Sequence, residues 1–134
     1  MRIITRSMNA TVKQLIGAEG EAIARRHLER AGLEFVAANV RYRVGEIDLV
    51  MRDADGTIAF VEVRRRTRAT YGGAAASVTH AKCRRLIAAA SHFIAAHRLD
   101  TRPCRFDVVS IEGCGDGARI DWLRDAFRLE DWIG

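Results

Sequence analysis

Asp48 and Glu62 are the two side chains of this sequence best placed for chemistry. They lie in neighbouring segments rich in valine, isoleucine and phenylalanine, which are typical of β-strands, so a hairpin can bring the carboxylates together. Two ionised carboxylates that face each other repel. A divalent cation, a shared proton or a nearby guanidinium can compensate for that repulsion. Carboxylate oxygens suit Mg²⁺ or Mn²⁺, and such an ion can activate water and neutralise charge on a phosphodiester.

The hairpin that would position the acids is predicted from Asp-Ala-Asp-Gly at 53–56, a turn sequence in which Gly56 can adopt positive φ. If the turn is centred on Asp55, residues whose numbers add up to 110 face each other, so Asp48 faces Glu62. A bulge at Gly56 would move this register by one residue on one strand.

The same register assigns side chains to the two faces of the hairpin. Glu46 is expected to face Arg64, on the side that carries the two acids. The opposite side is apolar and is expected to be core, with Ile47, Leu49, Val61 and Val63. An alternative to the metal site is a salt-bridge lattice on a solvated face, in which Arg41, Arg43 and Arg64 pair with the acids. Spacing alone leaves both interpretations open.

Arginine supplies most of the positive charge. The net charge is +5, the sequence pI is about 9.7, and only Lys13 and Lys82 are lysines. Guanidinium groups make bidentate contacts with phosphate, which favours an anionic partner. A genome-level bias toward arginine codons would produce the same ratio of arginine to lysine, although it would not explain local clustering.

The arginines cluster after the strand that carries Glu62 and at the start of the next helix. The clustered residues are Arg64, Arg65, Arg66, Arg68, Arg84 and Arg85. With Arg41 and Arg43, they are expected to hold a nucleic-acid backbone through salt-sensitive phosphate contacts, and DNA is the expected partner. A solvated basic loop over residues 65–78 is the alternative.

The elements that must carry these residues follow from hydrophobic periodicity. Apolar residues at three- and four-residue intervals predict a helix that is stopped by Gly32, and a second helix that Thr79 caps. Strands are expected at 33–40, 46–52, 57–64, 105–112 and 118–123. The order helix–strand–strand–strand–helix–strand–strand predicts an α/β fold, with a mixed β-sheet flanked by helices.

Size and composition limit the class of protein. The 134 residues contain 49% hydrophobic and 29% charged residues, which indicates a folded globular protein. Residues 1–10 are expected to be a flexible tail and 11–134 a single domain. No apolar run reaches the roughly 18–20 residues of a membrane span, and the N-terminus lacks a secretory signal. A cytoplasmic location is therefore expected.

Several short stretches occur together in the order in which a known family has them. They are Gly17-Ala-Glu-Gly-Glu21, Asn39-Val-Arg41, Gly45-Glu-Ile-Asp-Leu49, Phe60-Val-Glu-Val-Arg64, Lys82, Arg105-Phe-Asp-Val108 and Ala126-Phe127. The chain thus resembles the uncharacterised bacterial UPF0102 (YraN-like) family. That family is assigned to the restriction-endonuclease-like PD-(D/E)XK superfamily and likened to archaeal Holliday-junction resolvases. The resemblance implies a restriction-endonuclease-like core, a DNA endonuclease activity that depends on Mg²⁺ or Mn²⁺, and a possible homodimer.

The resemblance also implies a role for each matching residue. Asp48 would be the central metal-binding acid, Glu62 the acid of a Glu-x-Lys element, and the Val63 carbonyl a further metal ligand. Glu21 matches a helical acid that leans toward the site. Lys82 matches the basic residue that the second helix offers to the same cleft.

Arg64 departs from the family pattern, because the nuclease signature has lysine at this position. Arginine stays protonated at physiological pH and cannot act as a general base, although it can stabilise a developing negative charge. Lys82 could supply the missing ammonium group. The sequence therefore fits a metal-dependent nuclease, and also a nucleic-acid-binding module with weak or no catalysis. A protein-interaction adaptor has the least support.

Overall fold

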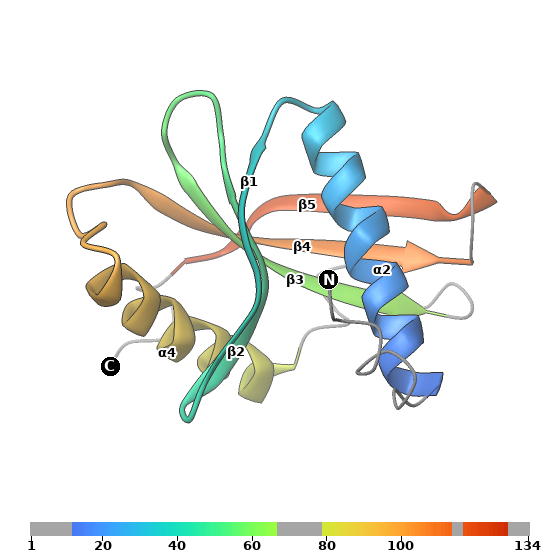
Figure 1. Cartoon of the computed structure of the whole chain (residues 1–134), viewed down its shortest axis with the longest axis horizontal. Coiled ribbons are helices and arrows are strands. Elements are labelled where there is room, and N and C mark those ends of the chain that lie inside the picture. The colour runs from blue at the N-terminus through green and yellow to red at the C-terminus, as the bar shows by residue number, and fades with distance from the viewer. Residues whose placement is uncertain (1–11, 67–78, 114–116, 129–134) are drawn as a thin grey trace, which may run out of the picture.

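The computed structural model describes residues 12–66, 79–113 and 117–128 of the chain. These residues form two helices and five strands (Figure 1). The elements are α2 Val12–Arg30, β1 Glu34–Tyr42, β2 Gly45–Arg52, β3 Ile58–Arg66, α4 His80–Ala96, β4 Cys104–Glu112 and β5 Arg119–Phe127. The predicted order of helices and strands is confirmed, whereas the predicted tail lies outside the described residues. Neither described helix is long and apolar enough to cross a membrane.

The strands form one mixed sheet in the order β1-β2-β3-β4-β5. β3 and β4 are parallel, and the other neighbouring pairs are antiparallel. Parallel neighbours need a long crossover connection, and α4 lies in the connection between β3 and β4. The helix begins as predicted, because the Thr79 hydroxyl accepts a hydrogen bond from the Lys82 N–H at 3.2 Å. The predicted mixed sheet with flanking helices is confirmed.

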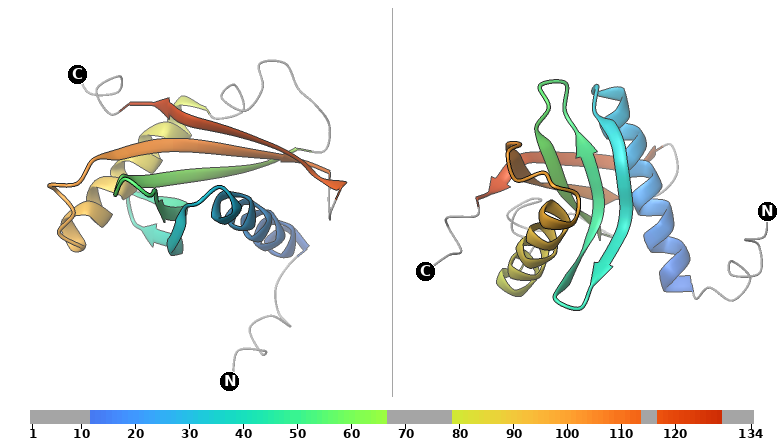
Figure 2. Two further views of the ribbon diagram at one scale, coloured as in Figure 1. Left: turned by 90° about the horizontal axis from the view of Figure 1, so that it is seen from above. Right: turned by 60° about the vertical axis from the view of Figure 1, so that its left-hand side comes forward.

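The two helices cover opposite faces of the sheet, and the right-hand view of Figure 2 shows β1 and β2 between them. Buried residues of α2 pack with odd-numbered residues of β2 and β3, namely Leu49, Met51, Ala59 and Val61. On the other face α4 packs over Val50, Ile58 and Phe60. The Phe60 ring lies 5.9 Å from Phe93 of α4. Both faces of this hairpin are therefore core, whereas the sequence interpretation expected only the odd-numbered face to be buried.

The β2–β3 hairpin has the predicted register, but only over part of its length. Leu49 pairs with Val61, so the paired residue numbers add up to 110 as expected, and the ladder runs from there to the turn. Beyond Leu49 the two strands are no longer paired with each other. β3 continues beside β4 as far as Arg66, and β2 continues beside β1 as far as Gly45. The sheet therefore forks between β2 and β3 (Figure 1).

The fork overturns three expected neighbour relations. Asp48 lies beyond the end of the β2–β3 ladder, so it is not paired with Glu62 as the turn register predicted. Glu46 is not paired with Arg64, and its carboxylate instead lies 4.0 Å from the Arg85 guanidinium of α4. Ile47 packs with the buried residues under α4. The alternation of odd and even numbers had predicted that it would lie with Leu49 on the other face. The reason is that β2 twists to follow β1 once it has left β3, so odd and even numbers no longer identify the same faces.

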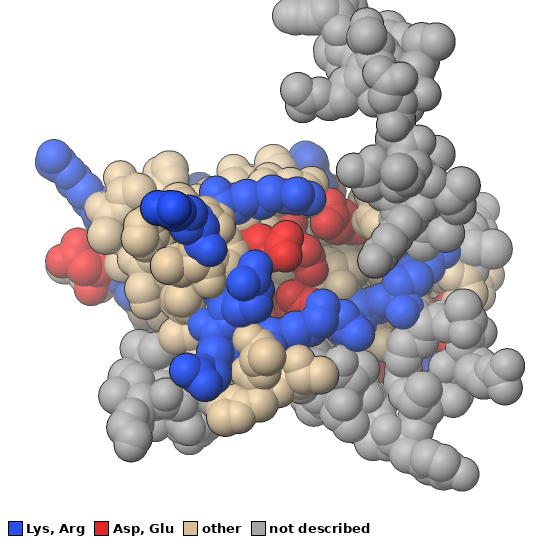
Figure 3. Space-filling model, turned by 90° about the horizontal axis from the view of Figure 1, so that it is seen from below, with Lys and Arg blue, Asp and Glu red and all other residues tan. Residues whose placement is uncertain are grey.

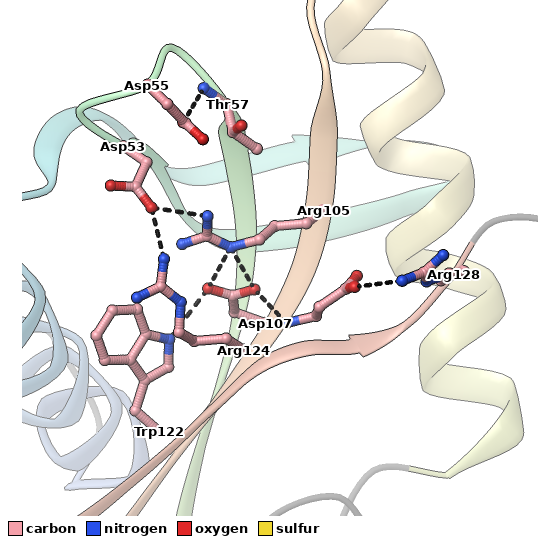
Figure 4. Close-up of polar contacts among 9 residues, drawn as sticks. Asp53, Asp55, Thr57, Arg105, Asp107, Trp122, Arg124 and Arg128 are labelled. Atoms are coloured by element: carbon pink, nitrogen blue, oxygen red, sulfur yellow. Dashed lines mark hydrogen bonds and ion pairs between the residues drawn. The ribbon is translucent and has the colours of Figure 1, made fainter.

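A buried polar cluster joins the strands near the other end of the hairpin, beside the β2–β3 turn (Figure 4). Asp107 of β4 is fully buried. Its oxygens accept hydrogen bonds from Arg105 Nε at 3.0 and 3.1 Å, from Trp122 Nε1 at 3.0 Å and from the Asp125 N–H at 2.9 Å. Arg105 Nη1 also donates to Asp53 of the turn at 2.8 Å. The cluster thus ties β4, β5 and the turn together.

Candidate functional site

Asp48 lies on β2 where that strand separates from β3, and its side chain crosses the fork. Asp48 Oδ2 accepts a hydrogen bond from the Val63 N–H at 2.8 Å. The N–H and C=O of one residue in a strand point to the same edge, so the Val63 carbonyl is also directed toward β2. The fork therefore places the Asp48 carboxylate and the Val63 carbonyl on the same side, as a pair of oxygen donors.

Glu62 is the adjacent residue on β3 and is buried, with 9% of its surface exposed. Arg64 Nη1 lies 3.7 Å and Lys82 Nζ 3.8 Å from Glu62 Oε2. Burial, and then the negative charge of Asp48, raise the pKa of Glu62 to about 7, although the two cations act in the opposite direction. Arg64 and Lys82 therefore compensate for only part of the cost of ionising Glu62.

Asp48 is perturbed in the same direction. Burial raises the pKa of its carboxyl group, the hydrogen bond from Val63 lowers it, and the charge of Glu46 raises it further. Two neighbouring acids with raised pKa values are not what a solvated salt-bridge lattice would produce, because exposed arginines would lower both values. The pair is better described as a site at which a further positive charge would stabilise the ionised carboxylates.

The oxygen donors at the fork resemble those that a divalent cation takes. Among the described residues, no three His, Cys, Asp or Glu side chains are close enough to one another to hold a metal ion. The fork instead offers two carboxylates and one carbonyl. Mg²⁺ usually keeps several waters and binds one or two carboxylates together with phosphate oxygens. Asp48, Glu62 and Val63 therefore fit Mg²⁺, or the similar Mn²⁺, as a partial shell that water and substrate would complete.

Glu21 lies on α2, near enough to the fork for the charge of Asp48 to act on it. Its side chain is half-buried and hydrogen-bonded to Asn39 of β1. Burial raises the pKa of Glu21, and the negative charge of Asp48 adds to this effect, while Arg41 opposes it. Asn39 has φ 52°, a left-handed conformation that is uncommon for a residue other than glycine. The sequence interpretation did not assign Asn39 a role, yet it positions the third acid.

Exposed cations border these acids on the face shown in Figure 3. Acidic atoms lie near the centre of this view, with lysine and arginine on both sides. The predicted phosphate contacts that are exposed come from the β1–β2 hairpin and from the first turns of α4: Arg41, Arg43, Arg84 and Arg85. Lys82 is also exposed on α4. The hairpin and the helix thus present positive charge from two directions around the carboxylates.

Arg65 is directed away from the acid pair. Its Nη2 atom donates to Glu19 of α2 at 3.0 Å and to the Gly113 carbonyl at 2.9 Å. Successive side chains of a strand point to opposite faces, so Arg64 and Arg65 cannot both be beside Glu62. The predicted arginine cluster is therefore divided between the two faces of the sheet. The side chain of Arg66 and the whole of Arg68 lie outside the described residues.

The fold and the fork define an α/β protein with a paired-carboxylate site, and sequence comparison identifies its family. Residues 20–111 match the sequence model of the uncharacterised protein family UPF0102. The UPF0102 protein of Burkholderia vietnamiensis is 56% identical over 122 residues, which cover 91% of this chain and 82% of the relative. The UPF0102 protein of Ralstonia nicotianae is 54% identical over 117 residues, or 85% of this chain and 87% of the relative. The chain belongs to the UPF0102 family, as its motifs predicted.

Proposed function

We propose that this protein binds nucleic acid and acts as a divalent-metal-dependent endonuclease on DNA phosphodiesters. The observation that carries the proposal is the pair of Asp48 and Glu62, whose pKa values are both raised, next to Arg64 and Lys82. Burial and mutual repulsion oppose ionisation of these acids, so the arrangement is unfavourable for stability alone. Ionisable groups perturbed in this way are concentrated at functional sites.

In the proposed site, Asp48, Glu62 and the Val63 carbonyl hold Mg²⁺ or Mn²⁺. When bound, the ion lowers the pKa of a water molecule and neutralises charge on the phosphodiester. The Val63 N–H fixes the orientation of the Asp48 carboxylate through its 2.8 Å hydrogen bond. Glu21 adds negative charge near Asp48 from the other side of the fork.

The two cations beside Glu62 would have different roles. Both lie within 4 Å of the same oxygen, so both can reach a phosphate group next to Glu62. Arg64 Nε is buried without a hydrogen-bond partner among the described residues, so the contact with Glu62 leaves the guanidinium only partly satisfied. Lys82 would supply the ammonium group of the signature lysine, which this chain lacks, because Arg64 stays protonated and cannot accept a proton.

We also propose that the chain belongs to the PD-(D/E)XK superfamily and is similar to archaeal Holliday-junction resolvases. This proposal is supported by the co-occurrence of the strand acid Asp48, the Glu62-x-basic element, the helical acid Glu21 and the helical cation Lys82 around one fork. A nucleic-acid-binding module with weak or absent catalysis is the second candidate. The observation that favours it is Arg64 at the position of the signature lysine.

Calorimetric titration with Mn²⁺ tests the metal site, and a cleavage assay tests the activity. Wild type, Asp48→Ala and Asp100→Ala are compared, and Asp100 is the control because it is exposed in the connection between α4 and β4. The expected result is metal binding and cleavage of duplex, single-stranded or branched DNA by wild type and Asp100→Ala, and loss of both in Asp48→Ala. Salt-dependent DNA binding that survives Asp48→Ala, without cleavage by any of the proteins, would favour the binding module. If no protein binds DNA or RNA at low salt, both proposals are wrong.

A further inference from the structure

The tip of the β1–β2 hairpin is a second feature of the face that carries the acid pair. Tyr42 pairs with Gly45, so Arg43 and Val44 form a two-residue turn. Val44 is 44% exposed, and it is one of few large apolar side chains that are exposed among the described residues. The turn is the lowest point of the sheet in Figure 1 and extends past α4. The hairpin therefore projects from the molecule as a narrow prong with an apolar and basic end.

Contacts with α4 support the base of this prong. The backbone of Gly45 lies against the main chain of Arg85, and a Cβ atom on Gly45 would collide with the Arg85 carbonyl. The Tyr42 ring lies 4.9 Å from the His92 ring on the same helix. The position of the hairpin is therefore set by the fold. A preorganised element of this kind loses little conformational freedom when it binds a partner.

The prong is a two-stranded β-ribbon, which is an element that can enter the major groove of B-form DNA. That groove is about 12 Å wide and about 8.5 Å deep, and it admits a two-stranded β-ribbon. Asp48 is four residues beyond Val44 on the same strand, which corresponds to about 13 Å. With the tip near the base edges, the acid pair would therefore lie near the rim of the groove, where the phosphates are. The major groove of A-form RNA is too deep and narrow for such an element.

The side chains on this face fit a duplex better than a single strand. Proteins that bind single strands usually stack bases on aromatic side chains. None of the Phe, Tyr and Trp side chains in the described part of the chain is exposed, and Tyr42 is engaged with His92. Arg41, Arg43, Arg84 and Arg85 instead provide charge for a phosphate backbone. An exposed valine between these charges is suited to contact with a thymine methyl group.

We infer that the partner is B-form duplex DNA and that the β1–β2 hairpin enters its major groove, with Arg43 and Val44 at the base edges. The inference rests on the proposed function, because it assigns the phosphates at the groove rim to the Asp48–Glu62 site. It goes further in naming the form of the nucleic acid and the residues that select it. Arg43 can donate two hydrogen bonds to guanine, whereas the remaining arginines contact only phosphates.

The test is fluorescence anisotropy with labelled DNA duplex, RNA duplex of the same sequence, and single-stranded DNA, in the presence of a chelator. The proteins are wild type, Arg43→Ala/Val44→Ser and Arg102→Ala. Arg102 is an exposed control at the opposite end of β2, beside the β2–β3 turn. Wild type and Arg102→Ala are expected to bind the DNA duplex at least about tenfold more tightly than the RNA duplex. The hairpin variant is expected to lose most of this preference and to retain its weaker binding to RNA and to the single strand.

Two further readings separate a groove contact from simple loss of charge. The slope of log affinity against log salt should stay nearly unchanged for Arg43→Ala/Val44→Ser, because phosphate contacts set that slope, whereas the affinity for DNA duplex should fall by about tenfold or more at fixed salt. Prior occupation of the major groove by methyl green should compete with wild type. Equal affinity of wild type for DNA and RNA duplexes would overturn the hairpin inference. An unchanged preference for DNA duplex in the hairpin variant would do the same. Neither result would contradict the proposed metal site. Absence of all nucleic-acid binding overturns both.

Discussion

Replacement of Glu62 by glutamine would measure the free-energy cost of ionising Glu62 in the folded protein. Burial and the charge of Asp48 raise the pKa of Glu62 from 4.5 to about 7. The folded protein thus holds the proton more tightly than the unfolded chain does. The stability that comes from this proton is fully present below about pH 4.5 and is lost as the pH rises through about 7. The difference between the two pKa values corresponds to about 3 kcal/mol.

Glutamine has nearly the shape of a protonated glutamate and does not ionise. Glu62→Gln is therefore expected to match wild type in free energy of unfolding near pH 4.5, and to be more stable by about 1–3 kcal/mol at pH 8. The lower figure allows for a titration that is shared with Asp48. Urea denaturation followed by circular dichroism, at both pH values and with a chelator present, measures the difference. Titrating groups outside the acid pair are common to the two proteins, so their contributions cancel.

One result would refute this reasoning. If Glu62→Gln were less stable than wild type at pH 8, then Arg64 and Lys82 would stabilise the ionised carboxylate by more than burial destabilises it. The salt-bridge interpretation would then replace the metal interpretation. Glu29→Gln is the matched control, because Glu29 is exposed and its carboxylate pairs with Arg25 at 3.1 Å. That change is expected to alter stability by less than about 0.5 kcal/mol at either pH.

Three further predictions concern the metal, the polar cluster and the hairpin. Mn²⁺ affinity measured by calorimetry should fall by about tenfold between pH 8 and pH 6, because a proton on Glu62 competes with the ion, and a pH-independent affinity would contradict the site. Asp107→Asn should lower the free energy of unfolding by about 2–4 kcal/mol in urea denaturation, since it removes one of the two carboxylates that pair with Arg105 and leaves Asp53 as the other. A loss below about 1 kcal/mol would show that the cluster is not stabilising. Gly45→Ala should lower the free energy of unfolding by about 1–3 kcal/mol in the same measurement, because its Cβ atom would collide with the Arg85 carbonyl. Gly17→Ala is the control, because a Cβ atom at this position of α2 has open space and should not destabilise the protein.

The central pair of residues could be identified from local sequence. The turn at 53–56 sets the register of β2 against β3, and Leu49 pairs with Val61 as the numbering predicted. A hairpin register depends on the turn and on the alternation of side chains, which are local properties. The cap of α4 by Thr79 was predictable for the same reason, and it places Lys82 in the first turn of the helix.

The fork was not predictable in this way. It arises because β3 stays paired with β4 and β2 stays paired with β1 where β2 and β3 separate, and the β3–β4 pairing joins strands that are distant in sequence. The β1–β2 turn is also difficult to recognise, because Arg43 and Val44 are not the Asn-Gly or Asp-Gly pair that usually marks a two-residue hairpin. The ion pair between Asp53 and Arg105 joins residues from separate elements, and nothing in either local sequence indicates the partner.

The division of the arginine cluster could have been anticipated from strand geometry. Arg64 has the even number of Glu62, whereas Arg65 has an odd number and must point to the face of α2. Counting charge in a stretch of sequence treats neighbouring arginines as one patch. Alternation along a strand separates them, so a patch is better inferred from every second residue.

The positive φ angles of Asn39 and Asp125 have a consequence for how copies of this chain can meet. Both residues have φ 52°, and they lie on β1 and β5, the two outermost strands of the described sheet. An outer strand offers unpaired main-chain groups that can recruit the strand of another molecule, and a local distortion interrupts that row. Each free edge here contains such an interruption. Growth of the sheet from one molecule into the next is thereby disfavoured, and the same distortion at Asn39 also brings its side chain to Glu21.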